Sequence, residues 1–424
     1  MVKITSLKAR QVLDSRANPT IEAEIGTGKG FFSAIVPSGA STGVHEALEL
    51  RDNEKPYFGK GVLGAVSNVN NDIAKSIVGK GFSSQKELDQ ALLDADATDN
   101  KSRLGANAIL SVSMAFAKAM AFENHQRLYE FLNEISGKKK FVLPIPQMNV
   151  LNGGKHAGKE ADIQEHMLLP MKFKSFSEAL QAGTETYHTL KKILKQKYGY
   201  YATLLGDEGG FVPPIDSVED RLELMLKAIG DSGYAGKIMI GLDCASSEFY
   251  KEGKYAIGEN KYSGAELVDF YADLVKKYNV VSIEDGMAED DWGSWTKLTS
   301  KLGNKTQLVG DDLLVTNAKR IQKALETKAC NSLLLKVNQI GTVTESIEAA
   351  KLALKNNWSV VVSHRSGETE DSFIADLVVG LGTGQSKFGA PARSERVAKY
   401  NQLLRIEEML GKEAVFLQGI KRGE

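Results

Sequence analysis

The chain has 424 residues, of which 42% are hydrophobic and 25% are charged, and its formal net charge at pH 7 is −1. This length allows two domains or one large barrel with an appendage, and the near-zero charge gives no electrostatic reason to expect nucleic acid or an anionic membrane as the main partner. No apolar run approaches the roughly 20 residues that span a bilayer, and the start MVKITSLKAR lacks the apolar core of a secretory signal. The two cysteines, Cys244 and Cys330, lie in apolar segments and suit a reducing compartment, so we expect a cytoplasmic globular protein.

The first 135 residues predict a small α+β domain. The β-like runs ITSLKARQVLD, TIEAEIGT and GFFSAIVP come first, and the helical runs KELDQALLDAD and ANAILSVSMAFAKAMAF follow. Strands followed by helices are typical of an α+β unit. The basic, glycine-bearing stretch ISGKKKF then marks a junction, so we expect one domain over residues 1–135 and a second over residues 140–424.

A glycine-bearing loop follows the third β-like run. Residues 39–43, GASTG, match G-x-S-x-G, the elbow that presents a nucleophilic serine in many hydrolases. Ser41 could therefore be a nucleophile, a residue that cradles a phosphate, or part of a loop with another task. Residues 37–43 are nearly all small, which favours a closing loop over a tight strained elbow, and no base, oxyanion hole or acid can be assigned as partners of a serine nucleophile.

From Val142 a different rhythm begins, in which apolar runs alternate with helical ones. The apolar runs KIMIGLD, VVSIED, QLVGDD, SLLLKVN and SVVVSH are separated by amphipathic segments with capping boxes, such as Ser263-x-x-Glu266 and Thr342-x-x-Glu345. Apolar strands without alternation, separated by helices, predict a parallel sheet covered on both faces. A segment of this length suits an eight-stranded α/β barrel of the TIM type, and an open doubly wound sheet is the alternative.

The start of this second domain breaks the alternation. The runs PQMNVLN and QEHMLLP are joined by GGKHAGKEADI, which is too short and too rich in glycine for a crossover helix. Because parallel neighbours normally need such a crossover, we expect these two strands to be antiparallel. Two helical runs then follow in succession, so the barrel should open strand-strand-helix-helix before six regular strand-helix units.

Nearly every apolar run of the second domain ends on an ionisable residue. In a parallel barrel the carboxyl ends of the strands lie around one rim, which is where active sites sit. A single polar strand end is simply where the chain leaves the interior, but this set has a chemical order of three carboxylates, a lysine, a His-Arg-Ser cluster and another lysine. We therefore expect six scattered residues to converge on one pocket: Asp243, Glu284, Asp311, Lys336, His364 and Lys387.

These residue types predict metal-assisted acid–base chemistry. Three carboxylates without clustered histidine or cysteine favour Mg²⁺ over Zn²⁺. Lys336 can act as a general base if nearby cations depress its pKa from the usual value of about 10.4. Glu208 in GDEGGF and Glu165 in IQEHM suit protonation of a leaving group on the opposite side, and the segment 364–366 offers donors for a phosphate or carboxylate.

These residues, in this order, resemble the enolase family along essentially the whole chain. The motifs that carry the resemblance are DSRANPT, VPSGASTGVHEALELRD, LGANAILSVS, NVLNGGKHAG, GDEGGF, IGLDCASSEF, SIEDGMAEDDW, LVGDDLLVTN, LLLKVNQIGT, VSHRSGETED and GAPARSER. Members of the enolase superfamily use a Lys or His base with Mg²⁺ to stabilise an enediolate. The resemblance implies reversible dehydration of 2-phosphoglycerate to phosphoenolpyruvate, in glycolysis and gluconeogenesis.

The resemblance also implies a role for each residue. Lys336 would remove the proton at carbon 2, and Glu208 would protonate the departing 3-hydroxyl with Glu165 beside it. Two Mg²⁺ ions would stabilise the aci-carboxylate, and Ser41, on a mobile lid of the small domain, would bind the ion that arrives with substrate. The other ion would be held by Asp243, Glu284 and Asp311.

The remaining implied contacts are with the substrate. Lys387 would bind its carboxylate, Arg365 and Ser366 its phosphate, and His156 would close over it. The set expected to contact substrate is His156, Glu165, Glu284, Asp311, His364, Arg365, Ser366 and Lys387. The family also implies a homo-oligomer, either a dimer or an octamer of dimers, with no need for nucleic acid or membrane.

The sequence departs from the family pattern at a few positions. Ala17 replaces the usual glycine of DSRGNP, so a turn there would differ if that position needs a positive φ. Ser386 and Phe388 flank Lys387 where Ile and Thr are typical, and His166 stands where Phe is usual, as a structural imidazole. Two alternatives remain: a superfamily member that acts on another carboxylate, and a scaffold role as a surface receptor or in an RNA-processing assembly.

Overall fold

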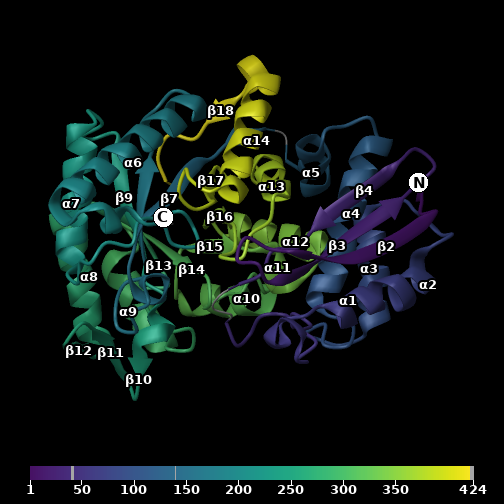
Figure 1. Ribbon diagram of the computed structural model, residues 1–424, viewed down its shortest axis with the longest axis horizontal. Coiled ribbons are helices and arrows are strands. Elements are labelled where there is room, and N and C mark those ends of the chain that lie inside the picture. The colour runs from purple at the N-terminus through teal and green to yellow at the C-terminus, as the bar shows by residue number, and fades with distance from the viewer. Residues whose placement is uncertain (40–42, 139, 421–424) are drawn as a thin grey trace.

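The computed structural model describes residues 1–39, 43–138 and 140–420 (Figure 1). Ser41, the predicted lid ligand, lies outside these residues. Figure 1 shows the N-terminal strands and helices on one side and a barrel surrounded by helices on the other. Within the described residues, no helix combines the length and the hydropathy that a membrane-spanning segment needs.

The N-terminal domain is an α+β unit, as predicted, and its main sheet is antiparallel. Its strands β2 (Ser6–Leu13), β3 (Pro19–Gly26) and β4 (Phe31–Ile35) form a meander in chain order. Helix α4 (Ala106–Glu123) packs on β3 and β4 and is buried along most of its length, because alanine and large apolar residues leave it no polar face. The other elements of this domain are β1 (Val2–Lys3), η1 (Pro56–Gly59), α1 (Leu63–Asn68), η2 (Val69–Ile73), α2 (Ala74–Ile77), β5 (Gly81–Phe82), α3 (Gln85–Asp96) and α5 (Leu128–Ser136).

The C-terminal part is a closed eight-stranded barrel, which confirms the barrel over the open sheet. Around the barrel each strand bonds to the next, and the last strand bonds to the first. The strands are β7 (Ile145–Asn152), β8 (Glu165–Pro170), β9 (Ile238–Asp243), β13 (Val280–Glu284), β14 (Gln307–Gly310), β15 (Ser332–Leu335), β16 (Ser359–Ser363) and β17 (Gln385–Lys387).

Strand β8 is antiparallel to both of its neighbours, as its short connection to β7 predicts. Met148 on β7 lies opposite Leu168, and Glu165 lies opposite Asp243 on β9. Two helices follow in succession, and regular alternation begins at β9, so the predicted opening of the barrel is confirmed. The outer helices are α6 (Phe176–Tyr198), α7 (Val218–Asp231), α8 (Gly264–Tyr278), α9 (Trp292–Leu302), α10 (Ala318–Thr327), α12 (Val343–Lys355), α13 (Phe373–Leu381) and α14 (Ser394–Leu410).

The two predicted capping boxes share one hydrogen bond, from the backbone of the glutamate to the capping hydroxyl, and differ in the partner of the glutamate carboxylate. Ser263 accepts a hydrogen bond from the Glu266 N–H, and the Glu266 carboxylate accepts one from the Ser263 N–H at 2.7 Å. Thr342 likewise accepts from the Glu345 N–H at 3.1 Å. The Glu345 carboxylate, however, accepts from the Thr342 hydroxyl and from Lys101 of the N-terminal domain at 3.0 Å, because this helix begins at the boundary with that domain.

Short elements account for the irregular spacing of the chain. Between β9 and α8 lies a three-stranded antiparallel sheet of β10 (Tyr250–Lys251), β11 (Lys254–Ile257) and β12 (Asn260–Tyr262), and this insertion lengthens the stretch between the strand-end residues Asp243 and Glu284. The other short elements are β6 (Val142–Leu143), η3 (Gly154–Ala157), η4 (Tyr200–Thr203), η5 (Ser246–Phe249), α11 (Val337–Ile340), η6 (Gly411–Glu413) and β18 (Val415–Phe416).

The barrel interior is filled in layers. Near one end, Gln147 and Gln307 both donate to Gln385 Oε1 at 3.0 Å, and Gln307 also donates to Ser359 Oγ at 2.8 Å. Two residues farther along three strands is an apolar cluster of Val309, Leu334 and Val361. Because alternate strand residues face the same side, the residues two positions farther still also face inward at the rim.

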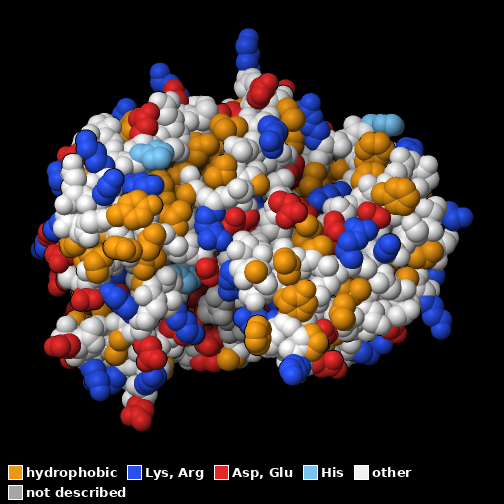
Figure 2. Space-filling view, viewed as in Figure 1, with side chains coloured by type: hydrophobic (Ala, Val, Ile, Leu, Met, Phe, Trp, Pro, Cys, Tyr) orange, Lys and Arg blue, Asp and Glu red, His pale blue; other side chains and the backbone are white. Residues whose placement is uncertain are grey.

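The N-terminal domain is attached beside this rim. Ser38 and Gly367, which follows β16, form an antiparallel bridge with N–O distances of 2.8 and 2.9 Å. The Ala47 N–H donates to Gln339 O on α11 at 2.9 Å. Charged side chains of both signs are intermixed over the surface in view (Figure 2), in keeping with the net charge of −1.

The departures from the family pattern have distinct structural outcomes. Ala17 has φ of 58°, so this turn does need the left-handed backbone that glycine adopts without strain. His166 is fully buried, and its Nδ1 lies 3.3 Å from Leu151 O, as befits a structural imidazole. Ser386 and Phe388 are also buried beside Lys387.

Candidate active site

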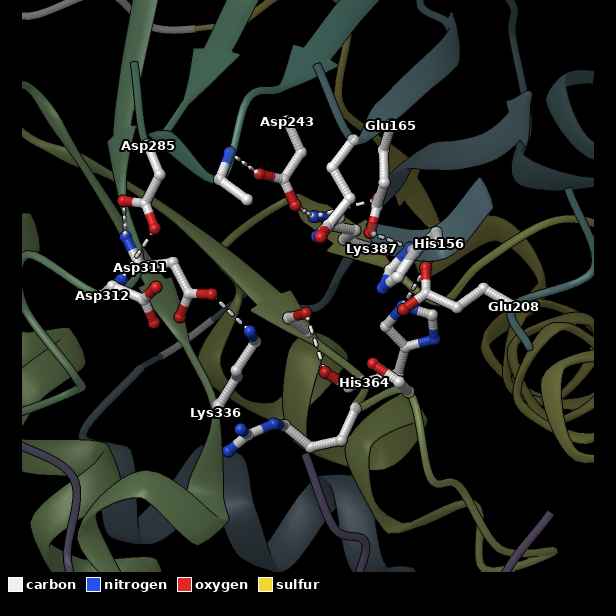
Figure 3. Close-up of a pocket in the computed structure, with 15 residues that line it drawn as sticks. His156, Glu165, Glu208, Asp243, Asp285, Asp311, Asp312, Lys336, His364 and Lys387 are labelled. Carbon is white, nitrogen blue, oxygen red and sulfur yellow. Dashed lines mark hydrogen bonds and ion pairs between the residues drawn. The ribbon is translucent and has the colours of Figure 1, made fainter. Parts of the chain in front are cut away.

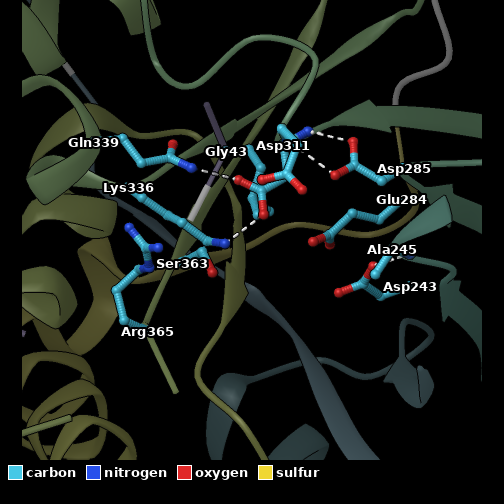
Figure 4. Close-up of polar contacts among 12 residues, drawn as sticks. Gly43, Asp243, Ala245, Glu284, Asp285, Asp311, Lys336, Gln339, Ser363 and Arg365 are labelled. Carbon is cyan, nitrogen blue, oxygen red and sulfur yellow. Dashed lines mark hydrogen bonds and ion pairs between the residues drawn. The ribbon is translucent and has the colours of Figure 1, made fainter. Parts of the chain in front are cut away.

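One pocket opens at the carboxyl-terminal rim of the barrel, and most of the predicted residues line it (Figure 3). Glu284 is buried next to the pocket, and Figure 4 shows it beside Asp243. Sequence reasoning did not assign five further lining residues: Gln164, Ala245, Asp285, Asp312 and Ser363. The predicted residues that line the pocket are His156, Glu165, Glu208, Asp243, Asp311, Lys336, His364, Arg365, Ser366 and Lys387.

Lys387 gathers three carboxylates on one side of the pocket. Its Nζ donates to Asp243 Oδ2 at 2.7 Å and to Glu284 Oε1 at 2.8 Å, and it lies 3.2 Å from Glu165 Oε2. The strand register explains this convergence, since Glu165, Asp243 and Glu284 lie side by side on β8, β9 and β13. Burial opposes the charge on Lys387, but the surrounding carboxylates hold its pKa well above the usual value.

Lys336 pairs with Asp311 on the other side of the pocket. Lys336 Nζ bonds to Asp311 Oδ2, and Gln339 Nε2 donates to Asp311 Oδ1 at 2.8 Å. Asp285 fixes the turn that carries Asp311, because its carboxylate accepts the N–H groups of Asp311 and Asp312, both at 2.9 Å. The sequence predicts a depressed pKa for Lys336, but here the pKa is raised, because Asp311 outweighs burial and the neighbouring cation Arg365.

Two glutamates and two histidines form the wall that faces Lys336. His156 Nδ1 lies 3.4 Å from Glu165 Oε1, and His364 Nε2 lies 3.3 Å from Glu208 Oε2. Arg396 Nη1 lies 2.8 Å from His364 Nδ1. Because arginine can only donate, Nδ1 must accept, and the ring proton lies on Nε2 and points toward Glu208. Burial lowers the pKa of His364 to about 4, so this donor is neutral at pH 7.

The two glutamates are shifted in opposite directions. Burial and the negative charge of Glu208 raise the pKa of Glu165 well above its usual value. Burial opposes ionisation of Glu208 as well, but the hydrogen bond from His364 and the positive charge of Arg396 hold its pKa well below the usual value. Asn149 on β7 adds a hydrogen bond to Glu208 Oε2 at 3.1 Å. Of the two carboxylates, Glu165 therefore has the greater tendency to hold a proton.

Arg365 and Ser366 lie on the rim after β16, between the barrel and the N-terminal domain. Arg365 pairs with Glu46 of that domain, with N–O distances of 2.9 and 3.1 Å. Burial opposes the charge of Arg365, but Glu46 raises its pKa. Arg365 and Ser366 thus place a guanidinium and a hydroxyl at the pocket wall, a combination suited to a phosphate.

The carboxylates at the rim fit a hard divalent cation. Glu284 Oε2 is buried and has no hydrogen-bond partner within the described residues, so the site has an anionic oxygen that its own side chains do not satisfy. The predicted ligands Asp243, Glu284 and Asp311 supply only carboxylate oxygens, the donors that Mg²⁺ prefers. Among the described residues, two groups of possible ligands have their donor atoms close together, His156-Glu165-Glu208 and Asp285-Asp311-Asp312. Only Asp311 of the predicted set belongs to either group, because Asp243 and Glu284 face Lys387.

Comparison with protein families gives two matches in chain order. Residues 4–132 match "Enolase, N-terminal domain", and residues 140–423 match "Enolase, C-terminal TIM barrel domain". The chain belongs to the enolase family. It is therefore an enzyme of the hydro-lyase kind that acts on small molecules and depends on a divalent metal, and the acidic groups at the rim could hold that metal.

Some features of this enolase site had a signal in the sequence and others had none. Asp285 and Asp312 each follow a strand-end acid directly, in VVSIED and QLVGDD. Two consecutive acids at the end of a strand could therefore have indicated that both lie at the rim. Gln164 directly precedes Glu165 in the same way. Glu46 gave no signal, because nothing in its local pattern tells that its segment reaches Arg365 on the barrel.

Proposed function

We propose that this enzyme catalyses the reversible, Mg²⁺-dependent dehydration of 2-phosphoglycerate to phosphoenolpyruvate. The observation that carries the proposal is the opposition of Lys336 and the Glu165–Glu208 pair across one pocket, with Arg365 and Ser366 at its wall. A proton donor and acceptor on opposite sides suit removal of a proton from one carbon and loss of hydroxide from the next.

The reaction demands concentrated positive charge. The proton next to an ionised carboxylate is very weakly acidic, and its removal leaves a doubly charged aci-carboxylate. Mg²⁺, when bound, would supply charge that stabilises this species. One ion would be held by Asp243, Glu284 and Asp311, and a second would involve Ser41, which lies outside the described residues.

Lys336 is the proposed base, and it must be neutral to accept the proton from carbon 2. In the structure Asp311 stabilises its charged form. Asp311 also belongs to the proposed metal ligands, so its use as a ligand would weaken its hold on the Lys336 proton. The nearby cations Lys387 and Arg365 both act to lower the pKa of Lys336.

The glutamate pair is the proposed source of the proton for the leaving hydroxyl. Glu208 is the donor that the family motif implies, yet its pKa is lowered while that of Glu165 is raised. Before the reaction the proton would therefore reside on Glu165. It would then move to Glu208, and Glu208 would transfer it to the leaving hydroxyl. Lys387 would bind the substrate carboxylate, and His156 would close over the substrate.

A direct assay tests the proposal. Purified protein with Mg²⁺ and 2-phosphoglycerate should give the rising ultraviolet absorbance of the enol product, and EDTA should abolish the signal. Absence of turnover with Mg²⁺, or turnover that survives EDTA, would rule the proposal out. A panel of other carboxylate substrates distinguishes a related superfamily activity, because such an enzyme would turn over one of them instead.

We also propose that the enzyme is a cytoplasmic homo-oligomer, a dimer or an octamer of dimers, in which residues 1–135 cap the catalytic domain of residues 140–424. The two cysteines in apolar segments support the compartment, and the family membership supports the assembly. Analytical ultracentrifugation tests the assembly, cell fractionation tests the compartment, and limited proteolysis between residues 135 and 140 tests the boundary. A monomer at micromolar concentration would contradict the proposed assembly.

A further inference from the structure

The N-terminal domain reaches into the site through one carboxylate. Glu46 Oε2 accepts from Arg365 Nη1 at 2.9 Å, and Glu46 Oε1 accepts from Nη2 at 3.1 Å. The two side chains are only 8% and 3% exposed. A two-point pairing of this kind fixes the plane of the guanidinium as well as its position. Figure 4 shows the guanidinium of Arg365 close to Lys336, the proposed base.

Glu46 is itself anchored by contacts that do not involve Arg365. The Gly43 N–H donates to Glu46 Oε1 at 3.1 Å, and the Glu46 N–H donates back to Gly43 O at 3.1 Å. Gln339 Nε2 lies 3.5 Å from the same carboxylate oxygen, and Gln339 O accepts from the next residue, Ala47, at 2.9 Å. These contacts therefore fix the position of the Glu46 carboxylate independently of Arg365.

A residue of the barrel also holds the guanidinium. Asn338 Oδ1 accepts from Arg365 Nη1 at 3.1 Å. Asn338 belongs to α11, the short helix that begins directly after Lys336. The same nitrogen is thus tied to both domains. An arginine side chain has much rotamer freedom, and restricting that freedom before a ligand arrives improves affinity.

We propose that Glu46 is a positioning residue, which holds Arg365 in the orientation that receives the substrate phosphate. This inference rests on the proposed function, since it takes the phosphate of 2-phosphoglycerate as the ligand of Arg365. The opposite role would be a placeholder that the phosphate displaces. The anchors on Gly43 and Gln339 favour positioning, because displacement would leave a buried carboxylate without its cation.

The test compares Glu46→Gln with the wild-type enzyme. Loss of a charge-assisted two-point contact should weaken binding of inorganic phosphate, measured by calorimetry with Mg²⁺ present, by about tenfold or more. The KM for 2-phosphoglycerate should rise by a similar factor, and kcat should fall by less. Glu54→Gln is the matched control, because Glu54 lies at an exposed position farther along the same segment, and it should leave both constants near wild type.

Two further variants separate positioning from a general structural role. In an Arg365→Ala background, Glu46→Gln should have no additional effect on phosphate binding. Asn338→Ala should shift phosphate affinity in the same direction by a smaller factor, and it decides the matter if Glu46→Gln does not fold. Unchanged or tighter phosphate binding in a folded variant would overturn the inference. A wild-type enzyme that binds phosphate but does not turn over 2-phosphoglycerate would defeat the proposed function alone.

Discussion

The rim of the barrel and the N-terminal domain both bury carboxylates, but the partners of these carboxylates differ. At the rim, Asp243 and Glu284 face Lys387, and Asp311 faces Lys336. In the N-terminal domain, Asp89 on α3 meets neutral donors of Gln85, Ser113 and Thr344, at distances of 2.5–3.0 Å.

This difference teaches what each set of carboxylates can do. Lysines at the rim can change partner or lose a proton when a cation or substrate binds, so the rim is suited to a reaction. Asp89 accepts from fixed hydroxyl, amide and backbone donors, one of them at the start of α12 on the barrel. Burial raises its pKa to about 6, and its bonds hold the two domains together. The rim should therefore be sensitive in activity, and the Asp89 network in stability.

The largest expected effect is at the rim. Lys336→Ala should lower kcat by about 10²–10⁴-fold, because it removes the proposed base, while the protein keeps its fold and binds substrate. Exchange of the carbon-2 proton into solvent, followed by NMR, measures the step directly. Lys319→Ala, at an exposed position on α10, is the matched control. Persistent exchange would mean that another group is the base.

Asp89→Asn should reduce stability and leave activity nearly unchanged. An asparagine presents an amide nitrogen to donors that now bond to a carboxylate oxygen, so at least one buried group loses its partner. The free energy of unfolding should fall by about 2–3 kcal/mol, with kcat little changed below the transition. Denaturant unfolding measures this loss. Asp94→Asn, exposed on the same helix, should change the free energy of unfolding little. A large loss of kcat in Asp89→Asn would contradict the assignment of the Asp89 network to stability.

His166 tests whether every ionisable residue of the barrel serves the reaction. Burial and Arg221 hold its pKa well below 6.5, so only the unfolded chain gains its proton in mild acid. Its contribution to stability is therefore present above pH 6.5 and is lost as the pH falls below that value. As the pH falls from 6.5 to 5, the free energy of unfolding of His166→Phe should rise relative to that of the wild type by up to about 1.4 kcal/mol per pH unit. Denaturant unfolding measures both values. A parallel pH dependence for the two proteins would contradict this assignment.

The smallest expected effect is in the N-terminal domain. Ala17 holds φ of 58° in the turn that begins at Asp14, whose backbone oxygen accepts from the Ala17 N–H at 3.0 Å. Ala17→Gly should raise the free energy of unfolding by about 0.5–1 kcal/mol, because relief of the strain exceeds the added entropy of the unfolded glycine. Thermal unfolding would measure it, and destabilisation would mean that the turn tolerates alanine without strain.

Much of the barrel could be predicted because its strands and helices leave a local pattern. Lys336 and Asp311 end on the rim for a reason visible in the sequence, since strand residues alternate sides and parallel strands finish together. The choice of partners could not be predicted in this way. That Lys387 pairs with Asp243 and Glu284, while Lys336 pairs with Asp311, depends on side-chain packing in three dimensions.

The contribution of the N-terminal domain was harder to predict for a related reason. Its strands and its two long helices were visible, but α1, α2 and α5 were not specified, and neither was the contact of Glu46 with Arg365. Such contacts depend on how two domains dock, and docking has no periodicity in the sequence. The direction of the pKa shift of Lys336 could not be read from the sequence for the same reason, because it depends on Asp311 as the partner of this lysine.

The direction of β8 has a consequence for which residues reach the catalytic face. Because this one strand runs downward, the turn before it, with His156, comes out at the catalytic face. The chain then leaves β8 at the far end, climbs through α6 and descends through α7, so the bend between these helices, with Glu208, also reaches that face. A barrel of uniformly parallel strands would also bring two connections to this face over the same stretch, but it would place the last residue of the second strand there, whereas the inverted β8 places its first residue, Glu165, there, opposite Asp243. One inverted strand thus puts the start of a strand, with Glu165, at the rim where all the other barrel strands end.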